Sequence, residues 1–592
     1  MKQRLKVAAL MGLGIYFLLF LAFFISHNVQ GGPLKTGFLV VAADRGFLGN
    51  QEIDAVMDQF KRRRIASLAL IGKDRQGIED GYAAYIRRAV AELEQQGVSQ
   101  FVVVPMFLSA GDALFQQYRD RIGQAIGHGN IQWAPPMAES YLTAQILLDR
   151  VEAVSTQPSG ERLVVLGSGA VDEASERRIR NDLERLAREV TDRHEFREVG
   201  VHVYYEHGAP GHEEKNEAVD ARIIRTAARR GRTLLVPFAI GVKFDQRMSM
   251  EGWMGRKFGQ FDIALGKSLF PHPDVLTWLH QTANRYSRAS REEVGVLIMP
   301  HGSTRPYNDG LERVVAPLRG RYRVEMAPGM GDPLILGQAV RKLEKEGVTR
   351  IIFIRMYALR DHMKARTDYM LGLAMDPPGD AHGKVPPRIR TSAVIERFGG
   401  YEESPLIAEI LLERIMEISE RPEDETVILL AHGTMDDEQN RRWIEVINDN
   451  IARIQKGLER PFRAIKAMTL REDWPDKRAR ALLRIREEIE QGNRNGGRVL
   501  VVSNRLYGSG PYQRLLEGLD FKMNGKGLVP HPNMTRWLEE GIGRIIQTML
   551  PPASLEREAG ETAGDESRRN HARVLKSEAP PGFRAGPRAA DG

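Results

Sequence analysis

Val294-Gly295-Val296-Leu297-Ile298-Met299 is a β-type apolar run that leads directly into Pro300-His301-Gly302-Ser303. A second such run, Ile351-Ile352-Phe353-Ile354, leads in the same way toward His362. Helix-like segments separate the two runs, which is typical of a parallel α/β sheet. Ligands of open α/β sheets bind at the carboxyl ends of the strands, and neutral imidazole is the commonest protein ligand for transition metals. The stretch therefore predicts a metal-binding pair, His301 and His362, at one sheet edge.

The same strand–helix pattern begins four times along the chain. The fourth copy carries His432 in Ala431-His432-Gly433-Thr434, directly after an apolar run. Asp172 matches Asp436 and Arg178 matches Arg442 at one constant offset, since 436 minus 172 and 442 minus 178 are both 264. The chain therefore reads as a tandem duplication of a two-module α/β body.

We expect six segments from this pattern. These are an N-terminal membrane anchor or signal at 1–32, modules at 37–155, 160–287, 294–420 and 424–549, and a disordered tail at 551–592. The tail is rich in Pro, Gly, Glu and Arg, and it has too little apolar surface to fold alone. The two modules of each half are expected to face one another across a cleft between their strand ends.

The first half is predicted to be degenerate. Ala43, Asp112 and Ser168 stand at the positions that match His301, His362 and His432 in the second half. A similar Pro-His-Pro step, Pro271-His272-Pro273, recurs at 530–532 before each half's last helix, where we expect a rigid turn. Chemistry is accordingly expected in the second half.

The modules resemble those of the class II tetrapyrrole chelatases, which insert cobalt, nickel or iron into sirohydrochlorin-type rings. The resemblance rests on His301-Gly302-Ser303, on the Asp332-Pro333 step and on His362. It implies chelatase-like βαβ modules with parallel sheets, arranged as two bilobal units in tandem. It also implies a lyase-type metallochelatase of the sirohydrochlorin cobaltochelatase or ferrochelatase kind, serving cobalamin or sirohaem biosynthesis. The metal is then a substrate and no nucleotide is needed.

The same resemblance assigns the site residues. Larger bilobal members carry a catalytic Glu two residues before an aromatic-Pro pair, and Glu472 has that spacing before Trp474-Pro475. The implied catalytic residues are His301, His362 and Glu472, and the implied metal ligands are His301, His362 and His432. The third module lacks the family's Glu, and the fourth lacks the second His. A site within one module and a site shared by two modules both remain open, and an ordinary solvated acid at a helix start is the alternative for Glu472.

Composition narrows the partners. The chain has 592 residues, a formal net charge of +7 and no cysteine, which excludes disulfides, thiolate metal sites and Fe–S clusters. Metal must therefore bind to imidazole, carboxylate or the substrate, and Fe²⁺, Co²⁺ and Ni²⁺ all suit such ligands. No basic stripe marks a nucleic-acid surface. The oligomeric state is left open.

The N-terminus predicts one transmembrane helix. Lys2, Arg4 and Lys6 precede 7–26, which holds 20 residues (26 minus 7 plus 1) without a charge. That length matches the roughly 30 Å core of a bilayer, whereas signal peptides have shorter apolar regions and a small-residue cleavage site. The charge pattern favours a membrane-anchored body on the periplasmic or other extracytoplasmic side.

Two other functions fit the sequence. The first is an extracytoplasmic protein that binds metal, haem or another tetrapyrrole without turnover, which the incomplete residue set of each module favours. The second is a structural relic that scaffolds other membrane enzymes. Metal insertion is the function that the motifs favour most.

Overall fold

The computed structural model describes residues 35–72, 81–127, 130–379 and 385–549 of the chain. The predicted anchor at 1–32 and the predicted tail at 551–592 lie outside these residues. Within the described ranges, no helix has both the length and the apolar character needed to cross a membrane. The chain forms two compact units, the first comprising 1–287 and 374–392 and the second 288–373 and 393–592.

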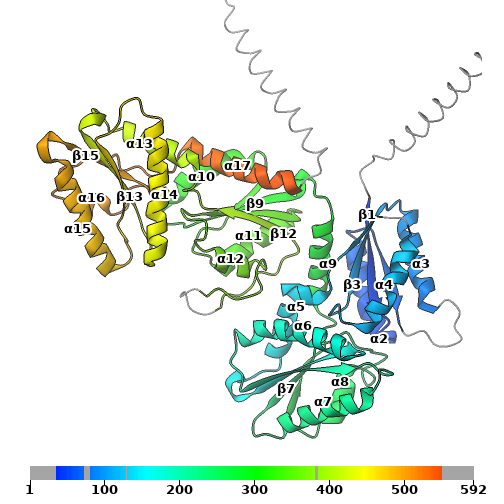
Figure 1. The fold of residues 1–592 in the computed structure, drawn as a ribbon. Helices are drawn as coiled ribbons and strands as arrows, with labels where there is room; N and C mark the ends of the chain where they lie inside the picture. The colour runs from blue at the N-terminus through cyan, green and yellow to red at the C-terminus, as the bar shows by residue number, and fades with distance from the viewer. Residues whose placement is uncertain (1–34, 73–80, 128–129, 380–384, 550–592) are drawn as a thin grey trace, which may run out of the picture. The chain divides into compact units, whose positions relative to one another are not determined.

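The first unit contains two α/β modules (Figure 1). The strands of the first module are β1 (Thr36–Ala43), β2 (Ala66–Ile71), β3 (Gln100–Met106) and β4 (Asn130–Trp133), and its helices are α2 (Phe47–Lys61), α3 (Gly81–Gln95), α4 (Ala113–Ile126) and α5 (Tyr141–Glu152). The strands of the second are β5 (Arg162–Ala170), β6 (Glu198–Tyr205), β7 (Thr233–Pro237) and β8 (Ile263–Leu265), and its helices are α6 (Glu173–Thr191), α7 (His212–Ala227), α8 (Met250–Phe258) and α9 (Pro273–Tyr286).

The second unit repeats this plan. The strands of the third module are β9 (Val294–Pro300), β10 (Arg323–Met326), β11 (Arg350–Met356) and β12 (Val394–Gly399), and its helices are α10 (Arg305–Arg319), α11 (Pro333–Lys345), α12 (Lys364–Met370) and α13 (Pro405–Met416). The strands of the fourth are β13 (Glu425–Ala431), β14 (Ala464–Thr469) and β15 (Arg498–Ser503), and its helices are α14 (Asp437–Lys456), α15 (Pro475–Gly492), α16 (Tyr512–Leu515) and α17 (Pro532–Met549).

All four sheets are parallel and share one strand order. The orders are β2-β1-β3-β4, β6-β5-β7-β8, β10-β9-β11-β12 and β14-β13-β15. The first strand of each module therefore lies between the second and the third, and the chain reverses its direction of winding between the first and third strands. Ligands of such sheets bind at the carboxyl ends of the strands at this point. The predicted α/β fold with four parallel-sheet modules is confirmed.

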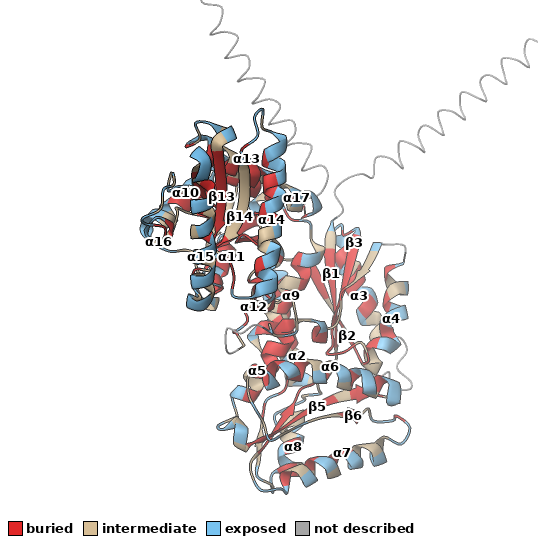
Figure 2. Ribbon diagram, turned by 60° about the vertical axis from the view of Figure 1, so that its left-hand side comes forward, coloured by how far each residue is buried: buried red, intermediate tan, exposed pale blue. Residues whose placement is uncertain are grey.

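Alternating residues on each strand bury two different faces. Phe38 and Val40 pack with α2, α5 and α9, whereas Leu39 and Val41 pack with α3 and α4. Because side chains of a strand alternate, a sheet covered by helices on both faces needs a continuous apolar run, and this is what the sequence has. Figure 2 shows the result as buried strands such as β1 and β13, flanked by helices with exposed outer faces.

One segment of the third module belongs to the first unit. Residues 374–392, which connect α12 to β12, are part of the first unit although the elements on either side of them are part of the second. No feature of the repeat pattern predicts this exchange. We call residues 374–392 the strap.

Candidate functional site

His301 and His432 have the same local geometry. Each follows the first strand of its module, and its ring Nδ1 lies 2.7 Å or 2.8 Å, respectively, from the carbonyl oxygen of the next residue, Gly302 or Gly433. A carbonyl can only accept a hydrogen bond, so Nδ1 carries the proton in both rings. In the neutral imidazole, Nε2 then keeps its lone pair. Metal-binding histidines are commonly fixed in this way, with the second ring nitrogen donating to a carbonyl.

The glycines are needed for this geometry. Gly302 and Gly433 have φ of 74° and 82°, in the left-handed region that side chains disfavour. A Cβ on Gly302 would lie 2.6 Å from Cβ of Pro328, and one on Gly433 would lie 2.9 Å from Oδ1 of Asn440. The His-Gly pair is therefore a turn at the carboxyl end of a strand, in which a glycine is required after the histidine.

In the fourth module an acidic pair faces the histidine. Nε2 of His432 lies 4.0 Å from Oε2 of Glu472 and 3.2 Å from Oδ2 of Asp473. Glu472 is buried and forms an ion pair with Arg505, which follows β15. The three strand ends of this sheet thus contribute His432, Glu472 and Arg505 to one row. The predicted His432 and Glu472 are brought together, whereas Asp473 and Arg505 were not predicted.

In the third module the loop 327–331 approaches the neighbours of both predicted histidines, Gly302 and Met363. A Cβ on Gly302, next to His301, would contact Pro328, and a Cβ on Gly331 would lie 3.0 Å from Cε of Met363, next to His362. The ring of His362 lies 4.9 Å from that of Tyr357, whose hydroxyl donates to the Gly329 carbonyl. His301 and His362 therefore flank one loop at the carboxyl edge of the sheet.

The strand-end loops of the third and fourth modules are in contact. The ring of Tyr307, in the first turn of α10, lies 5.5 Å from that of Tyr507, which follows β15. Arg442 of α14 forms an ion pair with Asp361 at 2.6 Å, one residue before His362. Burial raises the pKa of Tyr307 to about 12, although the charge of Arg505 opposes this shift. The first turn of α10 thus contacts the loop after β15, and the loop before His362 contacts α14.

The predicted ligands do not form a closed metal centre. Among the described residues, one group of three or more His or carboxylate side chains has ligand atoms mutually within 4.8 Å, and it consists of Asp149, His272 and Asp274 in the first unit. His301, His362 and His432 are therefore not gathered around one ion. His301 is exposed, and His362 and His432 are half-buried. Such an open arrangement suits a metal that passes through the site better than one that stays.

Exposed apolar side chains follow β10 in the third module. Met330, Leu334 and Ile335, after β10, have exposed fractions of 48%, 71% and 38%. Cδ1 of Ile335 would lie 3.9 Å from a Cβ on Gly329, within the loop that contacts Gly302. Asp332 caps α11 by accepting from the backbone N–H groups of Leu334 and Ile335, which fixes both residues at this edge. The site therefore combines imidazoles with an apolar surface.

The connection between β12 and α13 contains a buried acid. Glu402 is 0% exposed, and its Oε1 has no hydrogen-bond partner in the described structure. Its backbone N–H donates to the Ala358 carbonyl after β11, and the side-chain N–H groups of Asn450 and Asn504 donate to its carbonyl and carboxylate. Burial raises the pKa of Glu402 to about 8, so the side chain is a neutral acid at pH 7.

The first unit has apolar residues at the same places. The offset of 264 aligns Glu402 with Ala138 and Asn450 with Leu186, and Ala138 donates to the Leu108 carbonyl in the same way. Leu430 of β13 corresponds to Leu166 of β5. The strand residue that pairs with Leu430 is followed by Asn504, and the strand residue that pairs with Leu166 is followed by Phe238. The polar set is thus specific to the second unit. The sequence alone could have indicated this polar set, because aligning the two repeats places a polar residue of the second unit against an apolar residue of the first.

The degenerate positions of the first unit have structural roles. Ala43 ends β1 and Ser168 lies within β5. Asp112 caps α4 by accepting from the N–H groups of Leu114 and Phe115. Burial raises the pKa of Asp112 to about 7, and the nearby charge of Glu206 adds to the shift. A histidine site of the second-unit kind is therefore not present at these positions.

Comparison with known proteins gives one kind of match. No family model matches the chain, and no curated protein matches it. Among solved structures, SirB from Bacillus subtilis with Fe³⁺ is 15% identical, with a TM-score of 0.33, over 43% of this chain and 95% of that one. The sirohydrochlorin chelatase SirB from Bacillus subtilis subspecies spizizenii in complex with cobalt is 14% identical, with a TM-score of 0.31, over 42% and 94%.

Proposed function

We propose that the second unit inserts a divalent metal, Co²⁺, Fe²⁺ or Ni²⁺, into a sirohydrochlorin-type tetrapyrrole. The observation that carries this proposal is the local geometry that His301 and His432 share. In each ring a backbone carbonyl fixes Nδ1, and Nε2 is left as a base or ligand. Imidazole and carboxylate suit these three metals alike. The SirB proteins that resemble the chain hold Fe³⁺ and cobalt.

Insertion exchanges two pyrrole protons for one metal dication, so the site must accept protons while the metal loses water. His432 can accept one of the two protons at Nε2, and the water that the metal loses can carry away the other; Glu472, 4.0 Å from His432, stabilises the imidazolium that forms. Arg505 holds Glu472 in place through its ion pair. His301 and His362, at the edge of the other lobe, are the groups that would deliver the metal.

The test is metal insertion by the full chain. Purified protein, Co²⁺ and sirohydrochlorin should give a catalysed change in the visible spectrum of the ring. His432→Ala should lower the rate by about 100-fold, because it removes the base beside Glu472. Ser168→Ala, at the matching position of the first unit, is the control and should leave the rate unchanged. Equal rates in all three proteins would refute the assignment.

Binding without turnover is the second candidate. It is favoured by the incomplete residue set of each module, since the third lacks the family's Glu and the fourth lacks the second His. A binding protein would take up one equivalent of metal or ring and then stop. Multiple turnovers of the ring per protein molecule exclude it, and a stoichiometric end point excludes the enzyme.

We also propose that residues 7–26 anchor the chain in a membrane, with its body on the extracytoplasmic side. The support is the uncharged run after Lys2, Arg4 and Lys6. The full chain should remain in the membrane fraction after alkaline washing, and a variant lacking residues 1–32 should be released. A full chain that is released by the wash contradicts the anchor.

A further inference from the structure

The strap is bound to the first unit by two arginines. Nε of Arg388 lies 2.8 Å from Glu189, and both side chains are fully buried. Arg390 lies 2.6 Å from Asp149 of α5 and 2.8 Å from Asp274 of α9. The Arg388–Glu189 pair is buried, so the loss of one partner strongly destabilises the fold, whereas the Arg390 pairs are partly exposed. The two arginines therefore hold the strap firmly.

Backbone groups of the strap are bound as well. The Tyr141 hydroxyl donates to the Ile389 carbonyl at 2.9 Å, and Gln281 donates to the Thr391 carbonyl at 3.0 Å. Arg388 also donates to the carbonyls of Ala374 and Met375, both at 2.7 Å. One guanidinium thus joins the beginning of the strap, its end and the first unit.

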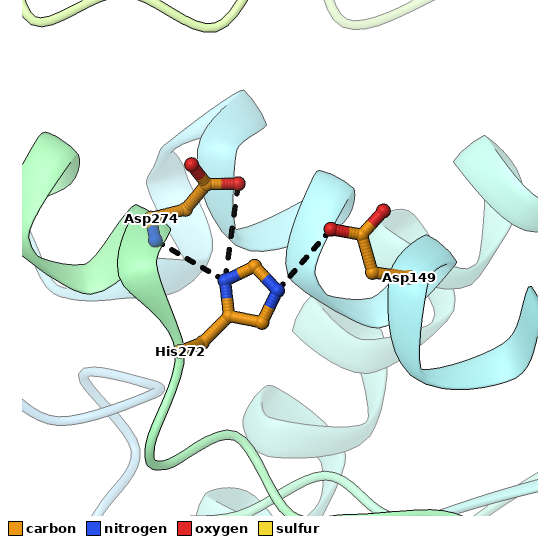
Figure 3. Close-up of side chains that lie close together, drawn as sticks. All are labelled: Asp149, His272 and Asp274. Atoms are coloured by element: carbon orange, nitrogen blue, oxygen red, sulfur yellow. Dashed lines mark hydrogen bonds and ion pairs between the residues drawn. The ribbon is translucent and has the colours of Figure 1, made fainter. Parts of the chain in front are cut away.

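The cluster that receives Arg390 resembles a metal site but is filled by the guanidinium. Nε2 of His272 donates to Asp149 at 3.2 Å, and Nδ1 accepts from the backbone N–H of Asp274 (Figure 3). Burial alone would raise the pKa of Asp149, yet hydrogen bonds from His272 and Arg390 lower it to about 2. Both carboxylates are thus paired with the guanidinium of Arg390, a cation that belongs to the chain itself.

The matching cluster of the second unit lacks one acid. His531 lies 2.9 Å from Glu413, which the offset of 264 aligns with Asp149, and its Nδ1 accepts from the N–H of Asn533 as His272 does from Asp274. Asn533 is an amide where Asp274 is an acid. Glu189, the partner of Arg388, aligns with Arg453. The acids that bind the strap are therefore specific to the first unit.

The strap lies in the chain between α12 and β12, close to His362. The strap begins four residues after the last residue of α12, and α12 begins two residues after His362. Its far end leads directly into β12, whose Arg397 pairs with Asp368 of α12 at 2.5 Å. One end of the strap is thus joined to α12 through the chain, and the other end is joined to β12, which is ion-paired with α12.

We infer that the first unit, which has lost the site histidines, serves as the receptor for the strap and thereby positions α12 and His362. The receptor surface comprises Glu189, Asp149, His272, Asp274 and Tyr141, and its ligand is the cationic strap with Arg388 and Arg390. The role of His362 itself rests on the proposed function, whereas the binding of the strap and its effect on α12 do not. His362 is the residue positioned, and Arg388 and Arg390 are the positioning residues.

Hydrogen exchange of the full chain tests the inference without any assay of activity. Arg388→Ala with Arg390→Ala should accelerate exchange in residues 357–370 by about tenfold or more, because α12 then opens locally. Asp274→Asn should act in the same direction, and the fold tolerates it because the second unit has Asn533 at this place. Arg536→Ala, which removes an exposed arginine of α17, is the control. Unchanged exchange in both strap variants would overturn the inference.

Metal insertion separates this inference from the proposed function. If the wild type inserts metal, the strap variants should do so about tenfold more slowly, with a higher KM for Co²⁺. Wild-type rates in the strap variants would overturn the positioning of His362. If the wild type shows no insertion while exchange in 357–370 still rises in the variants, the proposed function fails and the receptor role of the first unit stands.

Discussion

Nε2 of His432 lies 4.0 Å from Oε2 of Glu472, and the same carboxylate is ion-paired with Arg505. These residues come from the ends of three neighbouring strands of one sheet, which is where open α/β sheets place their ligand sites. The histidine can thus accept a proton beside a fixed negative charge. The third module adds His301 and His362 across a contact formed by Tyr307 and Tyr507.

The glycine after His432 is predicted to be essential. Gly433→Ala forces a Cβ to within 2.9 Å of Asn440 Oδ1 and 3.0 Å of the Arg471 nitrogen, at a φ of 82°. We expect a loss of about 1–3 kcal/mol in the free energy of unfolding, measured by urea denaturation. Gly543→Ala is the matched control, because its Cβ meets open space within α17 and should be neutral or stabilising. Equal stability of the two variants would contradict the account of the turn.

The apolar edge of the third module is predicted to bind the ring. Leu334→Ser removes the most exposed of its large apolar side chains and should weaken tetrapyrrole binding about tenfold, since a buried leucine contributes roughly 1.5–3 kcal/mol. Fluorescence titration with a metal-free ring measures the Kd. Leu483→Ser, on α15, changes another exposed leucine, with an exposed fraction of 62%, and should have no effect. A similar Kd for both variants would place the ring elsewhere.

The buried acid Glu402 gives a prediction about pH. A carboxyl group whose folded pKa is raised from 4.5 to about 8 stabilises the fold fully below pH 4.5, and this contribution is lost as the pH rises through 8. Glu402→Gln keeps the shape of the neutral acid but cannot ionise. The variant should therefore gain stability relative to the wild type between pH 5 and pH 8.5, by on the order of 1 kcal/mol or more. Parallel stability curves for the two proteins would mean that Glu402 does not titrate in this range.

The fold could be predicted because it depends on local patterns. Apolar strand runs such as Val294–Met299, and the offset of 264 between repeats, specify parallel modules without knowledge of tertiary contacts. The His-Gly turns could be predicted for the same reason. Glu472 was identified by spacing, but its partner Arg505 follows a different strand and only tertiary packing brings the two together.

The strap and the buried acid could not be predicted, because both depend on contacts between distant segments. Arg390 meets Asp149 and Asp274 across more than a hundred residues, and an arginine in a long connection is ordinarily solvated. Glu402 is followed by a second acid, Glu403, in a Gly-Tyr-Glu-Glu-Ser connection, so its burial is invisible in the local pattern. Comparison of the two repeats, position by position, is the signal that would have marked Glu402, whereas no feature of the repeat pattern marks the strap.

The central claim is that the two lobes of the second unit form one site, and paired rate measurements test it most directly. Metal insertion by the full chain is measured for the wild type, for His362→Ala, for Glu472→Ala and for the double variant. Glu325→Gln serves as the control, because Glu325 is paired with Lys342 at 2.6 Å. The account predicts that each single variant loses about 100-fold or more and that the double variant loses little beyond this, since groups that act as one unit are not additive. Full rates in both single variants would contradict it.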